Sequence, residues 1–167
     1  LIIGLAADGR TRLRDSGGQV VKPGQGVIAD GGASDNQIGE PGAGNVISGN
    51  SIGVRIYFDS VANVIQGNRI GTNAAGTGPL GNDTGIRVDG SDNIIGGISA
   101  GEANVIAYSK SIGVNLTEGT YVNNRIRGNS IHDSGQLGLE FDPPGPDFND
   151  PLDADEGRNH GQNFPII

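Results

Sequence analysis

Chemically active side chains occupy matching positions in short segments that each begin with glycine. Three of these segments are GVRIY (53–57), GIRVD (85–89) and GVNLT (113–117). Guanidinium groups bind carboxylates as forks, and an aromatic ring offers a surface on which a sugar can stack. We therefore predict a polysaccharide-binding face made of Arg55, Tyr57, Arg87, Asp89 and Asn115. The simpler alternative is an exposed, salt-bridged surface without a ligand.

Catalysis is a second hypothesis for the same face. Hydrolysis of a glycosidic bond needs two carboxyl groups at a set separation. Lyase chemistry at a uronate needs a base and a cation that neutralises the substrate carboxylate. Asp59 and Asp89 would supply the carboxylates, and Arg87 would act beside them.

The stretch DADEGRN (153–159) alternates acids with glycine and asparagine, as calcium-binding loops do. A hard cation prefers several oxygen ligands from a tight turn, so Asp153, Asp155 and Asn159 are candidate Ca²⁺ ligands. The stretch lacks the third acid and the terminal glutamate of an EF-hand loop. A solvated acidic linker is the alternative, and no other cofactor is expected.

The glycine-led segments are part of an internal repeat. They recur with spacings of 27, 32, 28 and 25 residues, as GVIAD (26–30), GVRIY (53–57), GIRVD (85–89), GVNLT (113–117) and GLEFD (138–142). Between consecutive members lie two more segments that begin with Asn and place Ile two residues later. Short alternating segments rich in Ile and Val indicate strands, so each repeat should contain three of them.

Equivalent residues should stack in rows if each strand pairs with its counterpart one repeat along, about 4.8 Å away. The predicted inward columns are Ile38–Ile65–Ile95–Ile126, Ile47–Ile70–Ile106–Ile131 and Val54–Ile86–Val114–Leu139. The predicted outward rows are Ile28–Arg55–Arg87–Asn115–Glu140 and Asp30–Tyr57–Asp89–Thr117–Asp142. Two asparagine ladders should form at the corners, Asn36–Asn63–Asn93–Asn124 and Asn45–Asn68–Asn104–Asn129.

The sequence therefore predicts an all-β fold. We expect a right-handed, single-stranded parallel β-helix with three short strands per coil and about four to five coils. Residues 26–142 form the β-helix. Residues 1–25 form an incomplete first coil or N-terminal cap, because IGLAADG (3–9) parallels IGTNAAG (70–76). Residues 143–167, rich in Pro and Asp, form a tail or cap.

Composition excludes several classes of protein. The 167 residues include 31 Gly and no Cys, so disulfide frameworks and thiolate metal sites are excluded. The net charge of −8 argues against nucleic-acid binding, which needs a basic stripe. No apolar run approaches the roughly 20 residues that span a bilayer, so membrane insertion is not expected.

The segments NVISGN (45–50), GNRIGTN (67–73) and NIIGG (93–97) resemble the repeat of pectin-lyase-like parallel β-helix proteins, in the type found in bacterial secreted surface proteins. The resemblance covers about residues 26–142 and implies an extracellular or cell-surface location. It implies no single activity, because the family includes surface proteins, tailspikes, lyases, hydrolases and epimerases. The Asp-Asp and Gly-His-Gly motifs of polygalacturonases do not occur together in this sequence.

We predict an extracellular, non-catalytic β-solenoid module that is structural, carbohydrate-binding or both. Its expected partner is a polysaccharide or a cell-surface glycan. One alternative is a polysaccharide lyase or glycoside hydrolase that uses the same face. Another is a filament subunit that self-associates through the β-helix ends, where unpaired strand edges can accept another chain.

Overall fold

The computed structural model describes residues 1–117, 119 and 121–141. Within these residues every regular element is a strand, which confirms the predicted all-β class. The strands are β1 Ile2–Ile3, β2 Gln25–Ala29, β3 Gln37–Ile38, β4 Val46–Ile47, β5 Ile52–Ile56, β6 Val64–Ile65, β7 Arg69–Ile70, β8 Thr84–Val88, β9 Ile94–Gly96, β10 Val105–Ala107, β11 Val114–Leu116, β12 Arg125–Arg127, β13 Ser130–His132 and β14 Leu139–Phe141.

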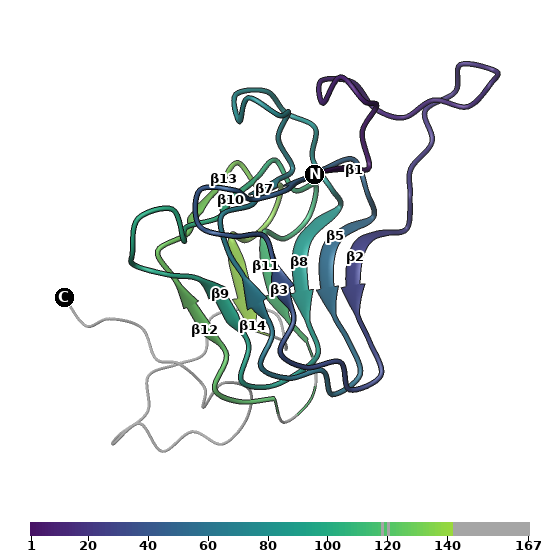
Figure 1. The fold of residues 1–167 in the computed structure, drawn as a ribbon. Coiled ribbons are helices and arrows are strands. Elements are labelled where there is room, and N and C mark those ends of the chain that lie inside the picture. The colour runs from purple at the N-terminus through teal and green to yellow at the C-terminus, as the bar shows by residue number, and fades with distance from the viewer. Residues whose placement is uncertain (118, 120, 142–167) are drawn as a thin grey trace.

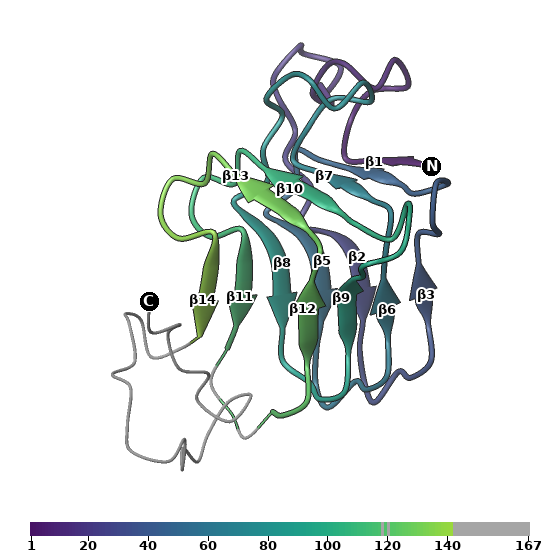
Figure 2. The same cartoon turned by 90° about the vertical axis from the view of Figure 1, so that its left-hand side faces the viewer.

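Each turn of the chain adds one strand to each of three parallel sheets (Figures 1 and 2). The glycine-led segments form the sheet β2-β5-β8-β11-β14, which we call the Gly-led sheet. The other two sheets are β3-β6-β9-β12 and β1-β4-β7-β10-β13. Four complete turns therefore run from β2 to β13, which confirms the predicted parallel β-solenoid with three short strands per coil.

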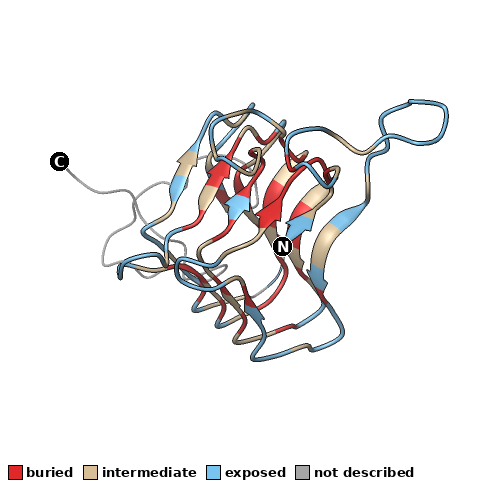
Figure 3. Cartoon of the chain, turned by 45° about the horizontal axis from the view of Figure 1, so that its top comes forward, coloured by how far each residue is buried: buried red, intermediate tan, exposed pale blue. Residues whose placement is uncertain are grey.

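The register between coils stacks identical or similar aliphatic residues. Ile65 pairs with Ile38 on one side and with Ile95 on the other, as predicted. The columns that contain Ile70 and Ile86 also follow the predicted register. Buried residues, red in Figure 3, recur in successive strands of the inner coils. Each coil adds one residue to each column, so one or two apolar residues per strand are enough to build the core.

Both predicted asparagine ladders are present. At each step the side-chain Nδ2 of one asparagine donates to the Oδ1 of its counterpart in the next coil, over 2.8 to 3.1 Å. A third ladder, which the prediction missed, joins Asn50 to Asn82 in the same way at 3.2 Å. Ser109 and Ser134 occupy the equivalent positions beside the leading glycines of the next strands.

The leading glycines of β2, β5, β8 and β11 lie too close to the next coil to carry a side chain. A Cβ atom on Gly53 would lie 2.5 Å from the carbonyl oxygen of Gly85, and one on Gly85 would lie 2.4 Å from that of Gly113. Contacts this short are forbidden between a carbon and a backbone oxygen. The recurrence of glycine at this position is therefore a packing requirement.

Long and short connections alternate where the chain passes from the sheet of β3 to the sheet of β4. Residues 39–45 and 97–104 form long connections, and residues 66–68 form the short connection between them. The long connections contact each other across the short one, since the backbone N–H of Gly42 donates to the carbonyl of Gly101 at 3.4 Å. Contacts thus extend between coils that are two apart.

A second corner repeats this arrangement. Residues 4–24 and 71–83 form long connections that lie side by side at the top of Figure 1, on either side of the short connection 48–51. The backbone N–H of Ala74 donates to the carbonyl of Gly9 at 2.8 Å. The N-terminal segment is therefore attached to the solenoid through a neighbour two coils away.

Of the two terminal segments, only the N-terminal one is among the described residues. β1 pairs with β4 in the register expected from the parallel between 3–9 and 70–76. Residues 143–167, the predicted tail, lie outside the described residues. In the part of the chain that is described, no helix is long and apolar enough to cross a membrane.

Candidate functional site

The outward row of the Gly-led sheet follows the predicted order. Arg55 on β5 pairs with Arg87 on β8, which pairs with Asn115 on β11, which in turn pairs with Glu140 on β14. Alternate residues of these strands point into the core, so the side chains between them point outward. We define the arginine face as Arg55, Tyr57, Arg87, Asp89 and Asn115.

Asp89 bridges the two arginines. Its Oδ2 atom lies 3.3 Å from the Nε atom of Arg55 and 3.4 Å from the Nε atom of Arg87. The Asp89 side chain is only 8% exposed, although the sequence predicted an outward position. Its burial follows from this contact, because both guanidinium groups pack against the carboxylate. Asp89 therefore compensates the repulsion between two stacked cations.

Both guanidinium groups use only their Nε atom in the ion pair with Asp89. Arg55 and Arg87 each contact Asp89 through Nε, and their Nη atoms have no hydrogen-bond partner among the described residues. The guanidinium carbon of Arg55 also lies 3.7 Å from the centre of the Tyr57 ring, a cation–π geometry. Nη donors of this kind can bind a carboxylate or sugar hydroxyl oxygens.

The aromatic surface continues beyond Tyr57. The ring centre of Phe58 lies 5.9 Å from that of Tyr57, and the two ring planes are tilted by 57°. Phe58 is 64% exposed. The repeat pattern did not indicate Phe58, because phenylalanine occurs at this repeat position in one coil only.

Tyr121 is a second residue that the sequence analysis missed. Burial raises the pKa of the Tyr121 phenol, and the negative charges of Asp59 and Asp89 raise it further, with a smaller effect from Tyr57. Tyr121 therefore lies in the electrostatic field of the arginine face. It belongs to the connection after β11, which differs in length from the connections of other coils, so no repeat alignment indicated it.

Two acceptor atoms lie at the other end of the outward row. The Oδ1 atom of Asn115 and the Oε1 atom of Glu140 are buried, and neither has a hydrogen-bond partner within the described ranges. Buried acceptors without partners are costly, so these two oxygens lower the stability of the row. Because they are buried, they are not part of the surface that a ligand would contact.

The catalytic candidates are only partly brought together. Asp59 is exposed in the turn after β5 and makes no ion pair in the described part of the chain. Asp89 is held by both arginines, which leaves its carboxylate committed to them. Arg87 contacts Asp89 and has no described contact with Asp59. Both Asp59 and Asp89 raise the pKa of Tyr121, but only Asp59 makes no ion pair within the described residues.

The predicted calcium ligands Asp153, Asp155 and Asn159 lie outside the described residues. Over residues 1–117, 119 and 121–141, no group of three His, Asp or Glu side chains comes together in a way that could hold a metal ion. The calcium site stays a prediction from the sequence.

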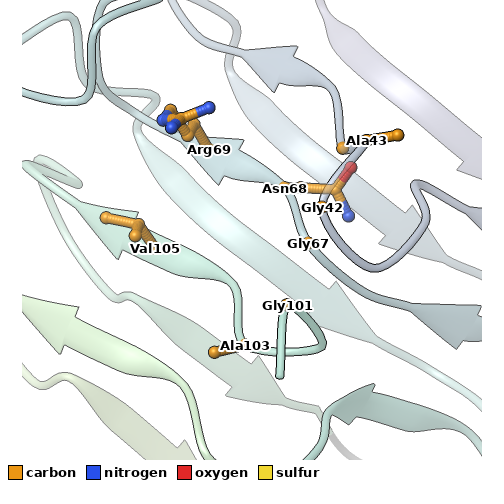
Figure 4. Close-up of a pocket in the computed structure, with 9 residues that line it drawn as sticks. Gly42, Ala43, Gly67, Asn68, Arg69, Gly101, Ala103 and Val105 are labelled. Carbon is orange, nitrogen blue, oxygen red and sulfur yellow. The ribbon is translucent and has the colours of Figure 1, made fainter. Parts of the chain in front are cut away.

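A shallow hollow lies on a different side of the solenoid, at the corner formed by residues 39–45 and 97–104. Figure 4 shows that its lining consists mainly of small residues, and that the side chain of Arg69 is directed away from the lining glycines. Backbone atoms of Gly42, Gly67 and Gly101 form much of the surface. The hollow offers few side-chain donors or acceptors, so the arginine face is the better candidate site.

Comparison of the chain with protein-family models, with curated proteins and with solved structures gives no match. The assignment of a function therefore depends on the geometry of the arginine face and on the resemblance of the repeat.

Proposed function

We propose that the chain is an extracellular, non-catalytic β-solenoid module that binds a polysaccharide on the arginine face. The observation that carries this proposal is the pair of stacked arginines on one row. The Nη atoms of Arg55 and Arg87 make no hydrogen bond within the described residues and can donate to a ligand. Sugars present hydroxyl groups that act as both donors and acceptors, and uronic acids add a carboxylate that fits a guanidinium fork.

The resemblance of the repeat to pectin-lyase-like proteins of the bacterial secreted surface type supports an extracellular or cell-surface location. The acidic composition is compatible with a soluble, self-repelling surface. A binding module also agrees with the contacts of Asp89, because its carboxylate is already paired with both arginines.

Affinity electrophoresis against a panel of uronic-acid and neutral polysaccharides tests the proposal. We expect retardation by at least one uronic-acid polymer, and a loss of affinity of about tenfold or more in Arg87→Ala, because a charge-assisted hydrogen bond is removed. Arg125→Ala is the matched control, since Arg125 is exposed on β12 in a different sheet. Failure of every polymer to bind, or equal losses in both variants, would refute the proposal.

The rival proposal is a polysaccharide lyase or hydrolase that uses Asp59 and Asp89. Assays for unsaturated products and for new reducing ends distinguish turnover from binding. Asp59→Asn is the informative variant, because Asp59 is exposed and lacks the ion pairs that make Asp89 structural. Turnover that Asp59→Asn abolishes would replace the binding module with an enzyme.

Self-association is a separate proposal. Strands β1, β2 and β3 each pair on one side only within the described residues, and unpaired edges can accept a further strand. Light scattering at increasing protein concentration tests it. A mass that stays at that of a single chain counts against a filament.

A further inference from the structure

Phe58 and Asp59 both lie in the left-handed backbone region, which a bulky residue such as phenylalanine disfavours. Their φ angles are 53° and 57°, in the left-handed region. A bulky residue at positive φ is a conformational outlier, because its Cβ approaches the following carbonyl oxygen. Outliers of this kind persist only where the surrounding structure maintains them, and they concentrate at ligand sites.

The preceding coil builds the same turn without this strain. Gly31 and Gly32 occupy the equivalent positions, with φ angles of 64° and 78°. The two turns stack directly, since the backbone N–H of Gly32 donates to the carbonyl of Phe58 at 3.0 Å. The fold therefore accepts glycine at this place in the coil, and the solenoid does not require a phenylalanine there.

Phe58 also gains little from packing. It is 64% exposed, so most of its ring remains in contact with water. Its described ring contact is with Tyr57, whose own ring lies under the guanidinium of Arg55. A guanidinium and two aromatic rings thus form one continuous strip at the edge of the arginine face.

We infer that Phe58 is a ligand-contacting residue, on which the apolar face of a sugar ring stacks while Arg55 and Arg87 bind that polymer's carboxylate groups. This inference rests on the proposed function and narrows the ligand to an acidic polysaccharide with accessible ring faces. The strip ends at guanidinium donors without a described Nη partner, which favours an anionic ligand. An aromatic side chain gives a large contact surface at low conformational cost.

Phe58→Gly separates a binding role from a structural role. Glycine adopts positive φ freely, so the thermal unfolding midpoint should be unchanged or higher than in the unsubstituted chain. Affinity for the uronic-acid polymer retarded in the electrophoresis assay should fall about fivefold or more. Phe58→Trp keeps an aromatic surface and should retain most of that affinity.

Each other outcome overturns the inference. A lower midpoint in Phe58→Gly would make Phe58 structural, and unchanged affinity would show that its ring does not contact the ligand. If the unsubstituted chain forms dimers that Phe58→Gly abolishes, the strip is a self-association surface instead. Arg87→Ala separates the two proposals. If Arg87→Ala loses affinity and Phe58→Gly keeps it, only the role of Phe58 is refuted. If the unsubstituted chain binds no polymer, both proposals are refuted.

Discussion

Asn63 donates two hydrogen bonds to a single atom of Asn93. Its backbone N–H and its side-chain Nδ2 both reach the Oδ1 of Asn93, at 3.0 and 3.1 Å. Asn93 then repeats the arrangement with Asn124. One side chain in this ladder therefore satisfies donors from the coil before it and donates to the coil after it.

Asn93→Ala should destabilise the solenoid by about 3 kcal/mol or more, because several buried polar groups lose their partners at once. Asn36→Ala is the matched control at the end of the same ladder. Asn36 is exposed and its side chain only donates within the described residues, so the loss should be about 1 kcal/mol. Urea unfolding followed by circular dichroism measures both. Equal losses would show that the ladder is not the source of stability.

Gly85→Ala should destabilise the chain by about 1–3 kcal/mol through overpacking. The new methyl group would lie 2.4 Å from the carbonyl oxygen of Gly113 and 2.8 Å from Cγ2 of Ile106. Gly24→Ala is a suitable control, because a Cβ at Gly24 meets no atom within 4 Å. Thermal unfolding of the two variants gives the comparison, and a stable Gly85→Ala would contradict the described spacing between coils.

Asp89→Asn should lower the free energy of unfolding by about 1–3 kcal/mol, because two adjacent guanidinium groups lose their shared carboxylate. The loss should be smaller in high salt, which screens the repulsion that remains between Arg55 and Arg87. Asp59→Asn should change stability by less than about 0.5 kcal/mol, since Asp59 is exposed and makes no described ion pair. Denaturant unfolding at two salt concentrations tests the pair, and a salt-independent loss in Asp89→Asn would argue against the bridge.

The pKa of Tyr121 should lie above the ordinary value of 10.0, because burial and then the charges of Asp59 and Asp89 disfavour the phenolate. Since the folded pKa is the higher one, the associated stability is complete below pH 10 and is lost as the pH rises through the folded pKa. Asp59→Asn should lower the pKa, as followed by NMR of ring-labelled tyrosine. Asp8→Asn, in the N-terminal segment, should leave it unchanged. If the pKa of Tyr121 is the same in Asp59→Asn as in the unsubstituted chain, Tyr121 lies away from the arginine face.

Much of the fold follows from spacing alone. Ile65 and its neighbours could be aligned because alternation within strands and the recurrence of glycine leave one register that buries them. The ladder of Asn50 and Asn82 escaped prediction because serine replaces asparagine in the next two coils, so the residue type does not repeat.

The candidate site was predictable where it lies on strands and unpredictable where it lies on turns. Arg55 and Arg87 are adjacent because the register between β5 and β8 pairs them. The burial of Asp89 depends on rotamers of the arginines, which no repeat pattern contains. Tyr121 and Phe58 lie on connections that vary between coils, so their positions follow from local backbone conformation.

The contacts between connections two coils apart restrict how such a chain can be lengthened or shortened. Removal of a single coil would bring two bulky connections, such as 39–45 and 97–104, onto directly successive layers, where the room is only about 4.8 Å. Deletion or insertion of a pair of coils would preserve the alternation. A designer who wishes to change the reach of this rod should therefore work in steps of two layers.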